Sequence, residues 1–334
     1  MNNSLPRFIL NLFNAVSEIA GVRILSLAEH RYLLNEPVKR YLSIHSEFIA
    51  LAGTLTAFTR YLSFRCEAEE LVNLSGSTEE YLQHPETLAN RVRGIAERYQ
   101  NPIDRFMVYY ADHFRDCNSQ WSQDIFVSYV LKEKKAGTFL ELGGADGITH
   151  SNSLSLETRY SWSGTLVEPH PSQFQLLKNT RQNIRNRLLN CAISITNERG
   201  TVQLSDNGQL SAIQGYDSRD LHAGIRSQSA DVFTVGCIPF KDVFDVYDEI
   251  DYLSLDVEGP EIELLTHVDW SKAPAVITVE HNWRRDVISG LRDLLVKKGY
   301  KEAFREHGWL TRGDLWFVQP SRDVVDIDTC GSTG

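Results

Sequence analysis

The sequence predicts an α/β protein in which a doubly wound, mainly parallel sheet follows an all-helical segment. Short apolar runs alternate with helical or irregular segments after residue 137, and this order predicts the sheet. Glycines or acidic residues stand at the carboxyl ends of four of these runs. Helix caps and an apolar stripe at helical spacing within residues 1–118 predict the helical segment.

The first third of the chain is predicted to be helical and accessory. Ser77 to Glu80 has the pattern of a capping box, and Asn101-Pro102 that of a cap followed by proline. We expect residues 1–118 to serve homo-oligomerisation, acceptor docking or closure of the site as a lid. The segment is predicted to begin with an amphipathic helix. The apolar stripe of this helix would pack on the protein's own core, on a partner helix or on a membrane surface. The stripe comprises Phe8, Ile9, Leu12, Phe13, Val16, Ile19 and Ala20.

Residues 119–320 are predicted to form the catalytic domain, and residues 321–334 a flexible tail. One more helix should end among the lysines and glycine of residues 132–137, which suit a helix C-terminus. Thr201–Leu204 is expected to be an inserted strand. The expected main strands are Thr138–Leu142, Gly164–Glu168, Leu188–Ile193, Tyr252–Asp256 and Ala275–Glu280.

Composition indicates a globular cytoplasmic protein and disfavours nucleic acid as a partner. The net charge of -10 would repel a polyanion. Five scattered cysteines, with no pair at metal-ligand spacing, fit a reducing compartment. No apolar run approaches the roughly 20 residues that cross a bilayer, and no export signal is found at the N-terminus. We therefore expect no transmembrane segment, while peripheral membrane contact stays open.

The segment from Thr138 to Gly147 is an apolar strand that runs into a glycine-rich turn. Gly143 and Gly147 would allow the backbone to approach a ligand closely, at the edge where open α/β sheets bind nucleotides. The spacing is not that of the dinucleotide fingerprint, and Glu141 would repel a pyrophosphate but attract an ammonium group. S-adenosylmethionine has an α-amino group and no phosphate, so it is the predicted cofactor. A tight turn without a ligand is the alternative.

A second acid stands where a ribose would lie. Glu168 closes the second apolar run, twenty-one residues beyond Gly147. An acidic side chain near this position accepts hydrogen bonds from ribose hydroxyls in nucleotide-binding sheets. Glu168 is therefore predicted to bind the cofactor ribose, and a merely solvated glutamate is the alternative.

Acidic and basic groups also end the fourth and fifth runs. Asp256 and Glu258 should lie beside the cofactor, because parallel strands deliver their carboxyl ends to one crevice. His281 is the preferred general base, Glu258 the second choice, and Asp256 would orient the acceptor or the base. A metal-assisted alternative places Mg²⁺ on Asp256 and Glu280, with Asn282 nearby, since Mg²⁺ prefers oxygen ligands.

The glycine turn, Glu168-Pro169-His-Pro171 and Asp256-Val-Glu258-Gly259 together resemble the FkbM family of S-adenosylmethionine-dependent methyltransferases. The resemblance covers about residues 119–318. The segments 119–124 and 146–153 are similar to a subgroup of that family. The family implies a Rossmann-like class I methyltransferase fold and O-methylation of hydroxyls on sugars, glycolipids or polyketide-type products. With the residues of the turn, the expected cofactor site comprises Glu141, Gly143, Gly144, Asp146, Gly147, Asn152 and Glu168.

The predicted function is methyl transfer from S-adenosylmethionine to a hydroxyl oxygen, on a sugar of a glycan, glycolipid or glycosylated natural product. One rival is an NAD- or nucleotide-sugar-linked oxidoreductase on the same fold, against which Glu141 and the glycine spacing argue. A second rival is a degenerate methyltransferase domain that acts as an assembly partner. The intact glycine turn and the acids at the strand ends argue against such decay.

Overall fold

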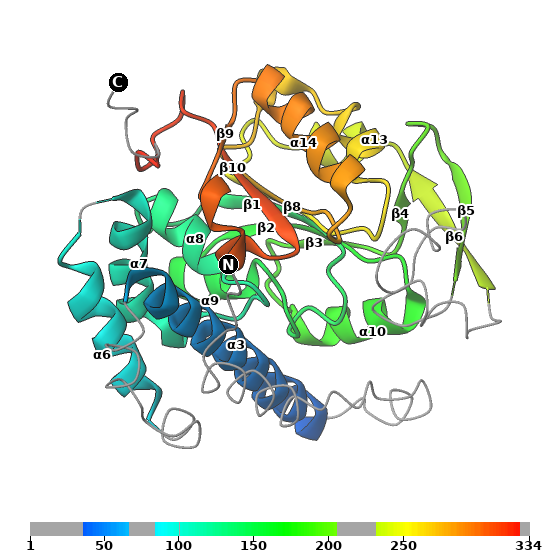
Figure 1. Cartoon of the computed structure of the whole chain (residues 1–334). Helices are drawn as coiled ribbons and strands as arrows, with labels where there is room; N and C mark the ends of the chain where they lie inside the picture. The colour runs from blue at the N-terminus through cyan, green and yellow to red at the C-terminus, as the bar shows by residue number, and fades with distance from the viewer. Residues whose placement is uncertain (1–35, 67–83, 100, 206–231, 328–334) are drawn as a thin grey trace.

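The computed structural model describes residues 36–66, 84–99, 101–205 and 232–327 (Figure 1). A seven-stranded sheet forms its centre, with strand order β3-β2-β1-β7-β8-β10-β9. All neighbours pair in parallel except β10, which runs antiparallel to β8 and β9. The strands are β1 (Thr138–Leu142), β2 (Ser163–Val167), β3 (Arg187–Leu189), β7 (Tyr252–Leu255), β8 (Val276–Glu280), β9 (Lys301–Glu302) and β10 (Asp314–Val318).

The order of the strands creates one crevice at the sheet edge. The chain goes outward from β1 to β2 and β3, and later returns to place β7 on the other side of β1. The carboxyl ends of β1 and β7 therefore lie side by side, with Leu142 paired to Leu255 and the Asp256 amide donating to the Leu142 carbonyl at 3.0 Å. A reversal of this kind is where doubly wound sheets bind their ligands.

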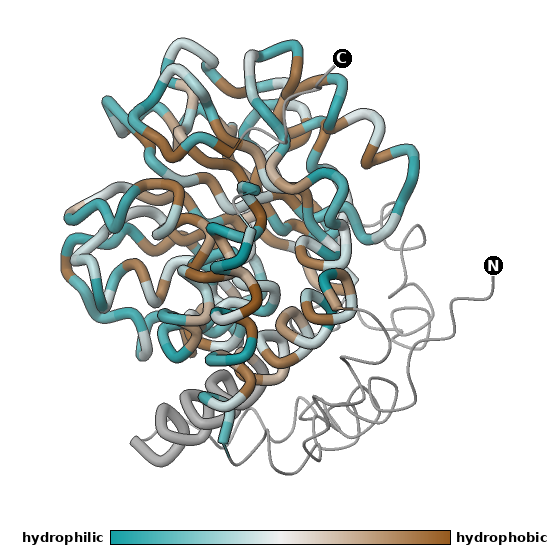
Figure 2. Tube along the Cα trace, turned by 60° about the vertical axis from the view of Figure 1, so that its left-hand side comes forward, coloured by the Kyte–Doolittle hydropathy of each residue, from teal (hydrophilic) through white to brown (hydrophobic). Residues whose placement is uncertain are grey.

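Both faces of the sheet are covered, because successive strand residues point to opposite sides. Phe139 and Tyr252 join a cluster with the helices on one face, whereas Leu140 and Leu253 join a cluster on the other. The brown tube segments of Figure 2 trace these apolar strands through the interior. The first face carries α3 (Glu36–Arg65), α6 (Pro85–Ala96), α7 (Pro102–His113), α8 (Gln123–Val130) and α9 (Leu154–Tyr160), and the second α12 (Lys241–Phe244), α13 (Glu261–Leu265) and α14 (Arg285–Lys297).

The helical segment and the sheet share one hydrophobic cluster. Phe58 of α3 and Phe106 of α7 belong to the same cluster as Phe126 and Trp316, and the rings of Phe126 and Trp316 stack with centroids 4.6 Å apart. A Cβ added to Gly53 would come within 2.6 Å of the Gln120 carbonyl oxygen, so α3 packs closely on the segment that precedes α8. The helices expected to be accessory thus pack directly on one face of the main sheet.

One predicted strand needs correction, and three strands were not predicted. The run Leu188–Ile193 is not one strand: β3 ends at Leu189, and β4 (Ala192–Ile193) belongs to a separate sheet of order β4-β6-β5. Between them the Asn190 side chain donates to the carbonyls of Glu168 and Pro169, which bends the chain out of the main sheet. The inserted strand is confirmed as β5 (Gly200–Ser205), but β6 (Val232–Ile238), β9 and β10 were not predicted.

The predicted helix ends and tail are partly correct. α7 begins at Pro102 as expected, but the Asn101 side chain makes no capping hydrogen bond, and its carbonyl accepts from the amides at 104 and 105 instead. α8 ends at Val130, before the lysines. Residues 321–327 of the predicted flexible tail pack on α8, where the Val325 amide donates to the Val130 carbonyl and Ile327 is buried. The apolar stripe of residues 8–20 and the capping box of residues 77–80 lie outside the described residues.

No helix in the described ranges combines the length and apolar character that crossing a membrane requires.

Candidate active site

A pocket lies at the carboxyl ends of β1, β2 and β7. Four predicted site residues line it, namely Gly143, Glu168, Asp256 and Glu258. The rest of the lining is mostly apolar and comes from both sheets, including Leu142, Val167, Ile193, Leu204, Val257 and Leu264. An apolar pocket with a few carboxylates at its rim suits a nucleoside whose base is buried and whose ribose is hydrogen-bonded.

Sequence reasoning missed one wall of this pocket. Cys191, Ala192 and Ile193 line it where the chain passes from β3 to β4, and Leu204 reaches it from β5. The only sequence signal for this wall is that residues 191–193 follow the third apolar run at the same sheet edge. The contribution of Leu204 depends on the side sheet, which local pattern does not reveal.

Glu168 is buried yet accessible to a ligand on the pocket side. Its Oε2 accepts from the Ala145 amide at 2.8 Å, and its Oε1 accepts from the His170 amide at 2.7 Å. Burial raises the pKa of this carboxyl to about 7, against the lowering effect of these two hydrogen bonds. Each carboxylate oxygen has a second lone pair, so Glu168 retains the capacity to accept from two further hydroxyl groups.

Glu141 is turned away from the pocket. The side chain is 3% exposed, and its oxygens accept from the Asn152 amide at 2.8 Å, from the Ser151 hydroxyl at 3.2 Å and from the Ser153 hydroxyl. Burial raises its pKa, whereas the charge of Arg181 lowers it. The carboxylate thus holds residues 151–153 against the end of β1.

Arg181 takes part in the same buried hydrogen-bond network. It is 2% exposed, and it donates to the Gly147 carbonyl at 3.3 Å, to the Ser151 hydroxyl at 3.0 Å and to Glu157 at 2.6 Å. Its guanidinium nitrogen also lies 3.9 Å from a Glu141 oxygen. The guanidinium pairs directly with Glu157 and lies near Glu141, so its charge offsets part of the negative charge of these two acids.

The glycines of the turn are required by packing. Gly143 has φ +95°, and a Cβ there would lie 1.9 Å from the Asp256 carbonyl oxygen. Gly147 has φ +80°, and a Cβ there would lie 2.6 Å from Arg181 Cγ. Both glycines were predicted to allow the close approach of a ligand, but protein atoms fill the space in front of each missing Cβ. Gly144 is different, since its Cβ would make ordinary contacts.

Two further predicted cofactor residues shape the loop that follows the turn. Asp146 is 1% exposed and accepts from the amides of Ile148 at 2.8 Å and Thr149 at 2.7 Å. Asn152 donates its side-chain amide to the Ser254 hydroxyl at 2.9 Å. Its Oδ1 is buried and has no hydrogen-bond partner among the described residues. A buried acceptor without a donor is costly, which marks Asn152 Oδ1 as a position for a ligand donor.

Three carboxylates converge beyond the pocket rim. Asp256, Glu258 and Glu280 each offer one oxygen, and these oxygens lie within 4.8 Å of one another. Burial raises the pKa of Glu280 well above its usual range, and the charges of Asp256 and Glu258 raise it further. Glu258 adopts φ +60°, an unusual backbone for a non-glycine residue, of the kind found at functional sites.

Asn282 spans this acid cluster. Its Nδ2 donates to Glu280 at 2.7 Å and to Glu258 at 3.4 Å. The residue is 6% exposed, and within the part of the chain that the structure describes its Oδ1 has no hydrogen-bond partner. Because the two ends of an amide interchange when it is turned over, the same side chain can direct either a donor or an oxygen ligand at the acids.

His281 is held by backbone groups on both sides. Its amide donates to the Gly313 carbonyl at 2.8 Å, and its Nδ1 accepts from the Trp283 amide at 2.9 Å. Burial lowers the pKa of the ring to about 4, so the ring is neutral at pH 7. With Nδ1 engaged as an acceptor, the ring proton resides on Nε2. The nitrogen lone pair that a general base needs is therefore already used.

The comparison with known families decides the class of this domain. Residues 141–302 match the family model described as the methyltransferase FkbM domain. These residues belong to the FkbM methyltransferase family. The FkbM domain so defined contains the glycine turn, Glu168, the acid cluster and His281, and it ends at β9. No curated protein sequence matches the chain.

Solved structures of MtNAS are similar to the whole chain at low identity. A mutant of MtNAS in complex with S-adenosylmethionine is 11% identical, with 93% of this chain and 90% of that chain covered and a TM-score of 0.31. MtNAS in complex with MTA and tNA is 10% identical, with 93% and 95% covered and a TM-score of 0.31.

Residues ahead of the FkbM domain reach its active-site edge. Gln123 of α8 donates to Asp314 at 2.7 Å, and burial raises the pKa of Asp314 to about 7. Asp314 pairs with Glu280 across β10 and β8. On the other side Glu261 begins α13, and burial raises its pKa to about 7. Acids thus surround the carboxyl ends of β7 and β8.

Proposed function

We propose that the protein transfers the methyl group of S-adenosylmethionine to a hydroxyl oxygen, on a sugar of a glycan, glycolipid or glycosylated natural product. The observation that carries the proposal is the arrangement of one pocket between two acidic rims. Glu168 lines the pocket where β2 ends, and Asp256 and Glu258 line it where β7 ends, on the other side of β1. The first rim suits a ribose, and the second suits an acceptor that must lose a proton.

The cofactor half of the proposal uses Glu168 and Asn152 as direct contacts. The two carboxylate oxygens of Glu168 would each accept from one ribose hydroxyl. Asn152 Oδ1 would accept from the α-ammonium group. Glu141 and Arg181 would keep the loop in place without touching the ligand. The wider predicted set of Gly143, Gly144, Asp146 and Gly147 would contribute the shape of the turn.

Glu258 is the base that the geometry favours. It lines the pocket, whereas the acceptor nitrogen of His281 is already engaged by the Trp283 amide. S-adenosylmethionine supplies an electrophilic methyl group on a sulfonium. The acceptor oxygen would form its bond to the methyl carbon as the carbon–sulfur bond breaks, and the hydroxyl proton would pass to Glu258. Asp256 would orient the acceptor, and His281 would hold the backbone of residues 281–283.

We further propose that Mg²⁺ binds at the acid cluster, through Asp256, Glu280 and Asn282. The donor set consists of oxygens, which Mg²⁺ prefers. The mutual charge of the acids and the unsatisfied Asn282 Oδ1 would both be relieved there. The chemistry supplied at this position is Lewis-acid polarisation of the acceptor oxygen.

Ligand-dependent unfolding tests the cofactor and separates the rivals. S-adenosylhomocysteine should raise the melting temperature of the wild type, because a ligand that binds only the folded state stabilises it. NAD should not. Gly143→Val is unsuitable as a probe, since its Cβ would collide with the Asp256 carbonyl and damage the fold. Glu168→Ala should lose the shift while the exposed-site control Glu198→Ala retains it.

The two negative outcomes have different meanings. A shift with NAD instead of S-adenosylhomocysteine would establish the oxidoreductase rival. A shift with neither ligand would favour the degenerate domain that serves assembly.

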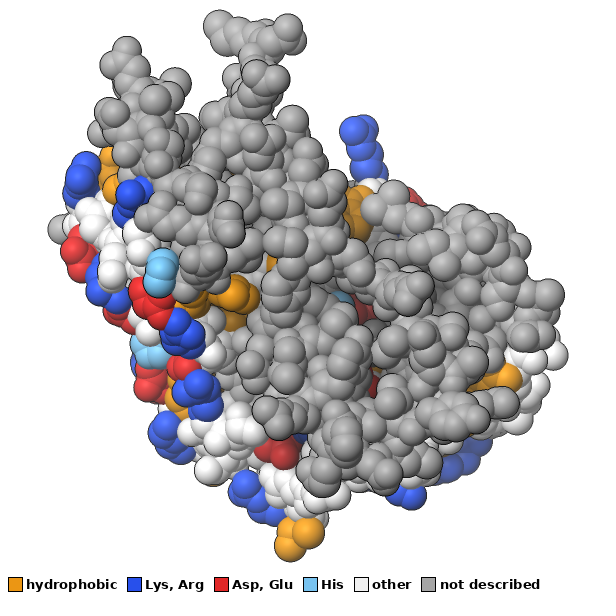
Figure 3. Space-filling model, turned by 90° about the horizontal axis from the view of Figure 1, so that it is seen from below, with side chains coloured by type: hydrophobic (Ala, Val, Ile, Leu, Met, Phe, Trp, Pro, Cys, Tyr) orange, Lys and Arg blue, Asp and Glu red, His pale blue; other side chains and the backbone are white. Residues whose placement is uncertain are grey.

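Location and partners follow as proposals of the same kind. We propose a cytoplasmic protein that forms homo-oligomers through its helical segment and acts without nucleic acid. Four free thiols among the described cysteines, at positions 66, 117, 191 and 237, support a reducing compartment. Acidic and basic side chains alternate along one margin of the described surface seen from below, with no single-sign basic patch there for a polyanion (Figure 3).

A further inference from the structure

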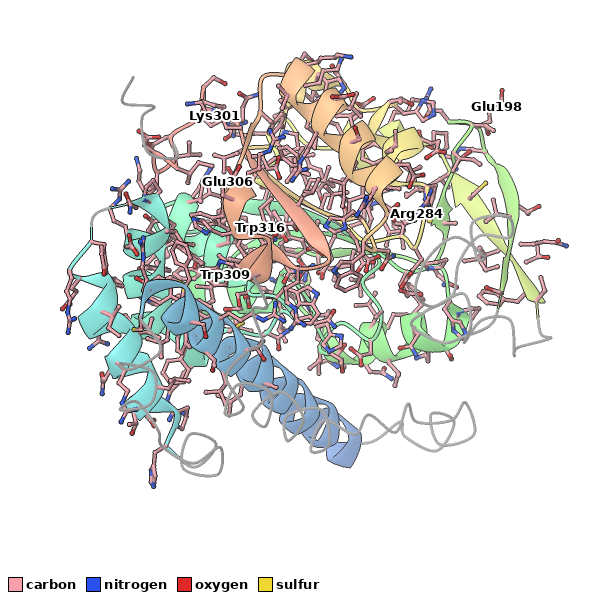
Figure 4. All side chains as sticks on the ribbon, viewed as in Figure 1. Glu198, Arg284, Lys301, Glu306, Trp309 and Trp316 are labelled. Carbon is pink, nitrogen blue, oxygen red and sulfur yellow. The ribbon has the colours of Figure 1, made fainter. Side chains whose placement is uncertain are left out.

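A half-exposed tryptophan, Trp283, follows Asn282, the residue that contacts the acid cluster, directly in the chain. Trp283 is 48% exposed, although the two residues before it, His281 and Asn282, are each only 6% exposed. The next residue, Arg284, lies beside the N-terminal end of α14, just past the carboxyl end of β8 (Figure 4). The indole therefore lies at the active-site edge of the sheet.

The backbone is strained in a way that presents this indole. Asn282 has φ +47° and Trp283 has φ +56°, two successive residues in the left-handed region. Such conformations are unfavourable for residues with a Cβ and tend to persist at functional sites. His281 holds the turn by accepting the Trp283 amide on Nδ1 at 2.9 Å. The side chain of His281 thus holds the backbone of Trp283 in this conformation.

A second tryptophan, Trp121, lies close to the same glycine as Trp283. A Cβ added to Gly313 would lie 3.4 Å from the six-membered ring of Trp283 and 3.8 Å from Nε1 of Trp121. Both tryptophans therefore flank Gly313, which precedes β10. The Arg312 guanidinium lies 4.0 Å from the ring centroid of Trp121 and keeps that ring in position.

The residue that precedes Trp283 in the chain contacts the acid cluster. Asn282, the neighbour of Trp283, donates to both Glu258 and Glu280. A pyranose ring has the matching chemistry, because its C–H groups pack on an aromatic face while its hydroxyls donate to carboxylates at the ring edge. A planar aromatic acceptor would use the indoles but not several carboxylates.

We propose that Trp283 and Trp121 form the acceptor subsite, which stacks a pyranose ring and directs one of its hydroxyls to Glu258. This inference rests on the proposed function and adds to it the residues that select the substrate class. Trp283 supplies the exposed stacking face. Trp121 would lie on the other side of the bound sugar ring from Trp283. The acids at the ends of β7 and β8 would accept hydrogen bonds from the sugar hydroxyls.

Saturation-transfer-difference NMR of the full chain tests the subsite. The probes are the methyl glycosides of D-glucose, D-mannose and L-rhamnose, with catechol as a planar aromatic, each added to protein saturated with S-adenosylhomocysteine. Wild type should transfer saturation to the ring C–H protons of at least one glycoside. Trp283→Ala should weaken that binding about tenfold, as loss of a stacking face does, and Trp283→Phe should restore most of it.

Trp270→Ala is the matched control. Trp270 is a partly buried tryptophan of the 3-10 helix Trp270–Lys272 that precedes β8, so it lies toward the opposite edge of the sheet. Its replacement should leave the glycoside signals unchanged. Calorimetry should show equal affinity for S-adenosylhomocysteine in wild type, Trp283→Ala and Trp270→Ala.

Each contrary result has a defined meaning. Glycoside signals that persist in Trp283→Ala, or that are absent from wild type with bound S-adenosylhomocysteine, overturn the subsite and leave the cofactor assignment intact. Saturation of catechol alone replaces the pyranose by a planar aromatic acceptor and likewise overturns it. Failure of wild type to bind S-adenosylhomocysteine overturns the proposed function, and the subsite with it.

Discussion

The two acidic edges of the active site use carboxylates in opposite ways. At the β1–β2 edge, Glu141 accepts hydrogen bonds from its own loop beside the buried Arg181. At the β7–β8 edge, Glu280 faces Asp256 and Glu258, whose charges raise its pKa. The first edge is therefore built to hold its own shape. The second concentrates negative charge, and this is where a cation or an acidic proton of the substrate would be stabilised.

The largest expected effect tests the β7–β8 edge. Glu258→Gln should lower kcat by about 10²–10⁴-fold, as the loss of a general base does, while S-adenosylhomocysteine affinity is kept. Glu263→Gln, which changes an exposed residue of α13, is the control and should behave as wild type. Turnover and calorimetry on both variants measure the difference. If Glu258→Gln also abolishes Mg²⁺ binding, Glu258 is a metal ligand and not the base.

The next effect tests the β1–β2 edge by stability. Glu141→Ala removes the acceptor of the Asn152 amide and of the Ser151 and Ser153 hydroxyls, while Arg181 keeps its pair with Glu157. The free energy of unfolding should fall by about 1–3 kcal/mol for each buried donor left without an acceptor. Urea denaturation measures it, with the exposed Glu198→Ala as control. Unchanged stability together with lost cofactor affinity would show that Glu141 contacts the methionine part of the ligand.

Stabilisation by Mg²⁺ should depend on the acids of the β7–β8 edge and not on those of the β1–β2 edge. At one hundred times its dissociation constant the ion should stabilise the fold by about 2.7 kcal/mol, and EDTA should reverse the shift. Glu280→Gln should lose this response, whereas Glu168→Gln should keep it. Full activity of the metal-stripped enzyme in EDTA would remove Mg²⁺ from the mechanism.

The pKa of Glu168 gives a pH dependence with a definite sign. Its folded pKa is raised from 4.5 to about 7, so its contribution to folding stability is present below pH 4.5 and is lost as pH rises through 7. Ribose hydroxyls donate to the ionised form, so S-adenosylhomocysteine affinity should rise about tenfold from pH 6 to pH 8. Glu168→Gln should flatten this profile in calorimetry. A slope lost instead in Glu261→Gln would assign the titration to Glu261.

The smallest effect concerns His281. His281→Asn removes one neutral hydrogen bond to the Trp283 amide, a loss of about 1 kcal/mol, so kcat should fall by less than about tenfold. Turnover of the folded variant, checked by circular dichroism, measures it. A fall of 10²-fold or more, with cofactor affinity intact, would return the role of base to His281.

Local pattern predicted the parallel strands because these strands are buried on both faces. β1 has the expected bounds, β2 is displaced by one residue at both ends, and β7 and β8 each differ from expectation by one residue at one end. The half-exposed β6 and the antiparallel β10 were not predicted from the sequence. β6 depends on pairing with β5, and β10 depends on pairing with β8. Pairing between distant segments leaves little signal in either segment alone.

The sequence by itself determined the sheet, the glycine turn and the placing of acids at the strand ends, because period and turn chemistry depend on near neighbours. Tertiary structure decided what those residues do. Gly143 is required by the approach of Asp256, and Glu141 is turned inward by the loop at 151–153 and by Arg181. A carboxylate acts as a ligand contact, a base or a support according to the donors around it. Those donors come from segments that meet only when the chain folds.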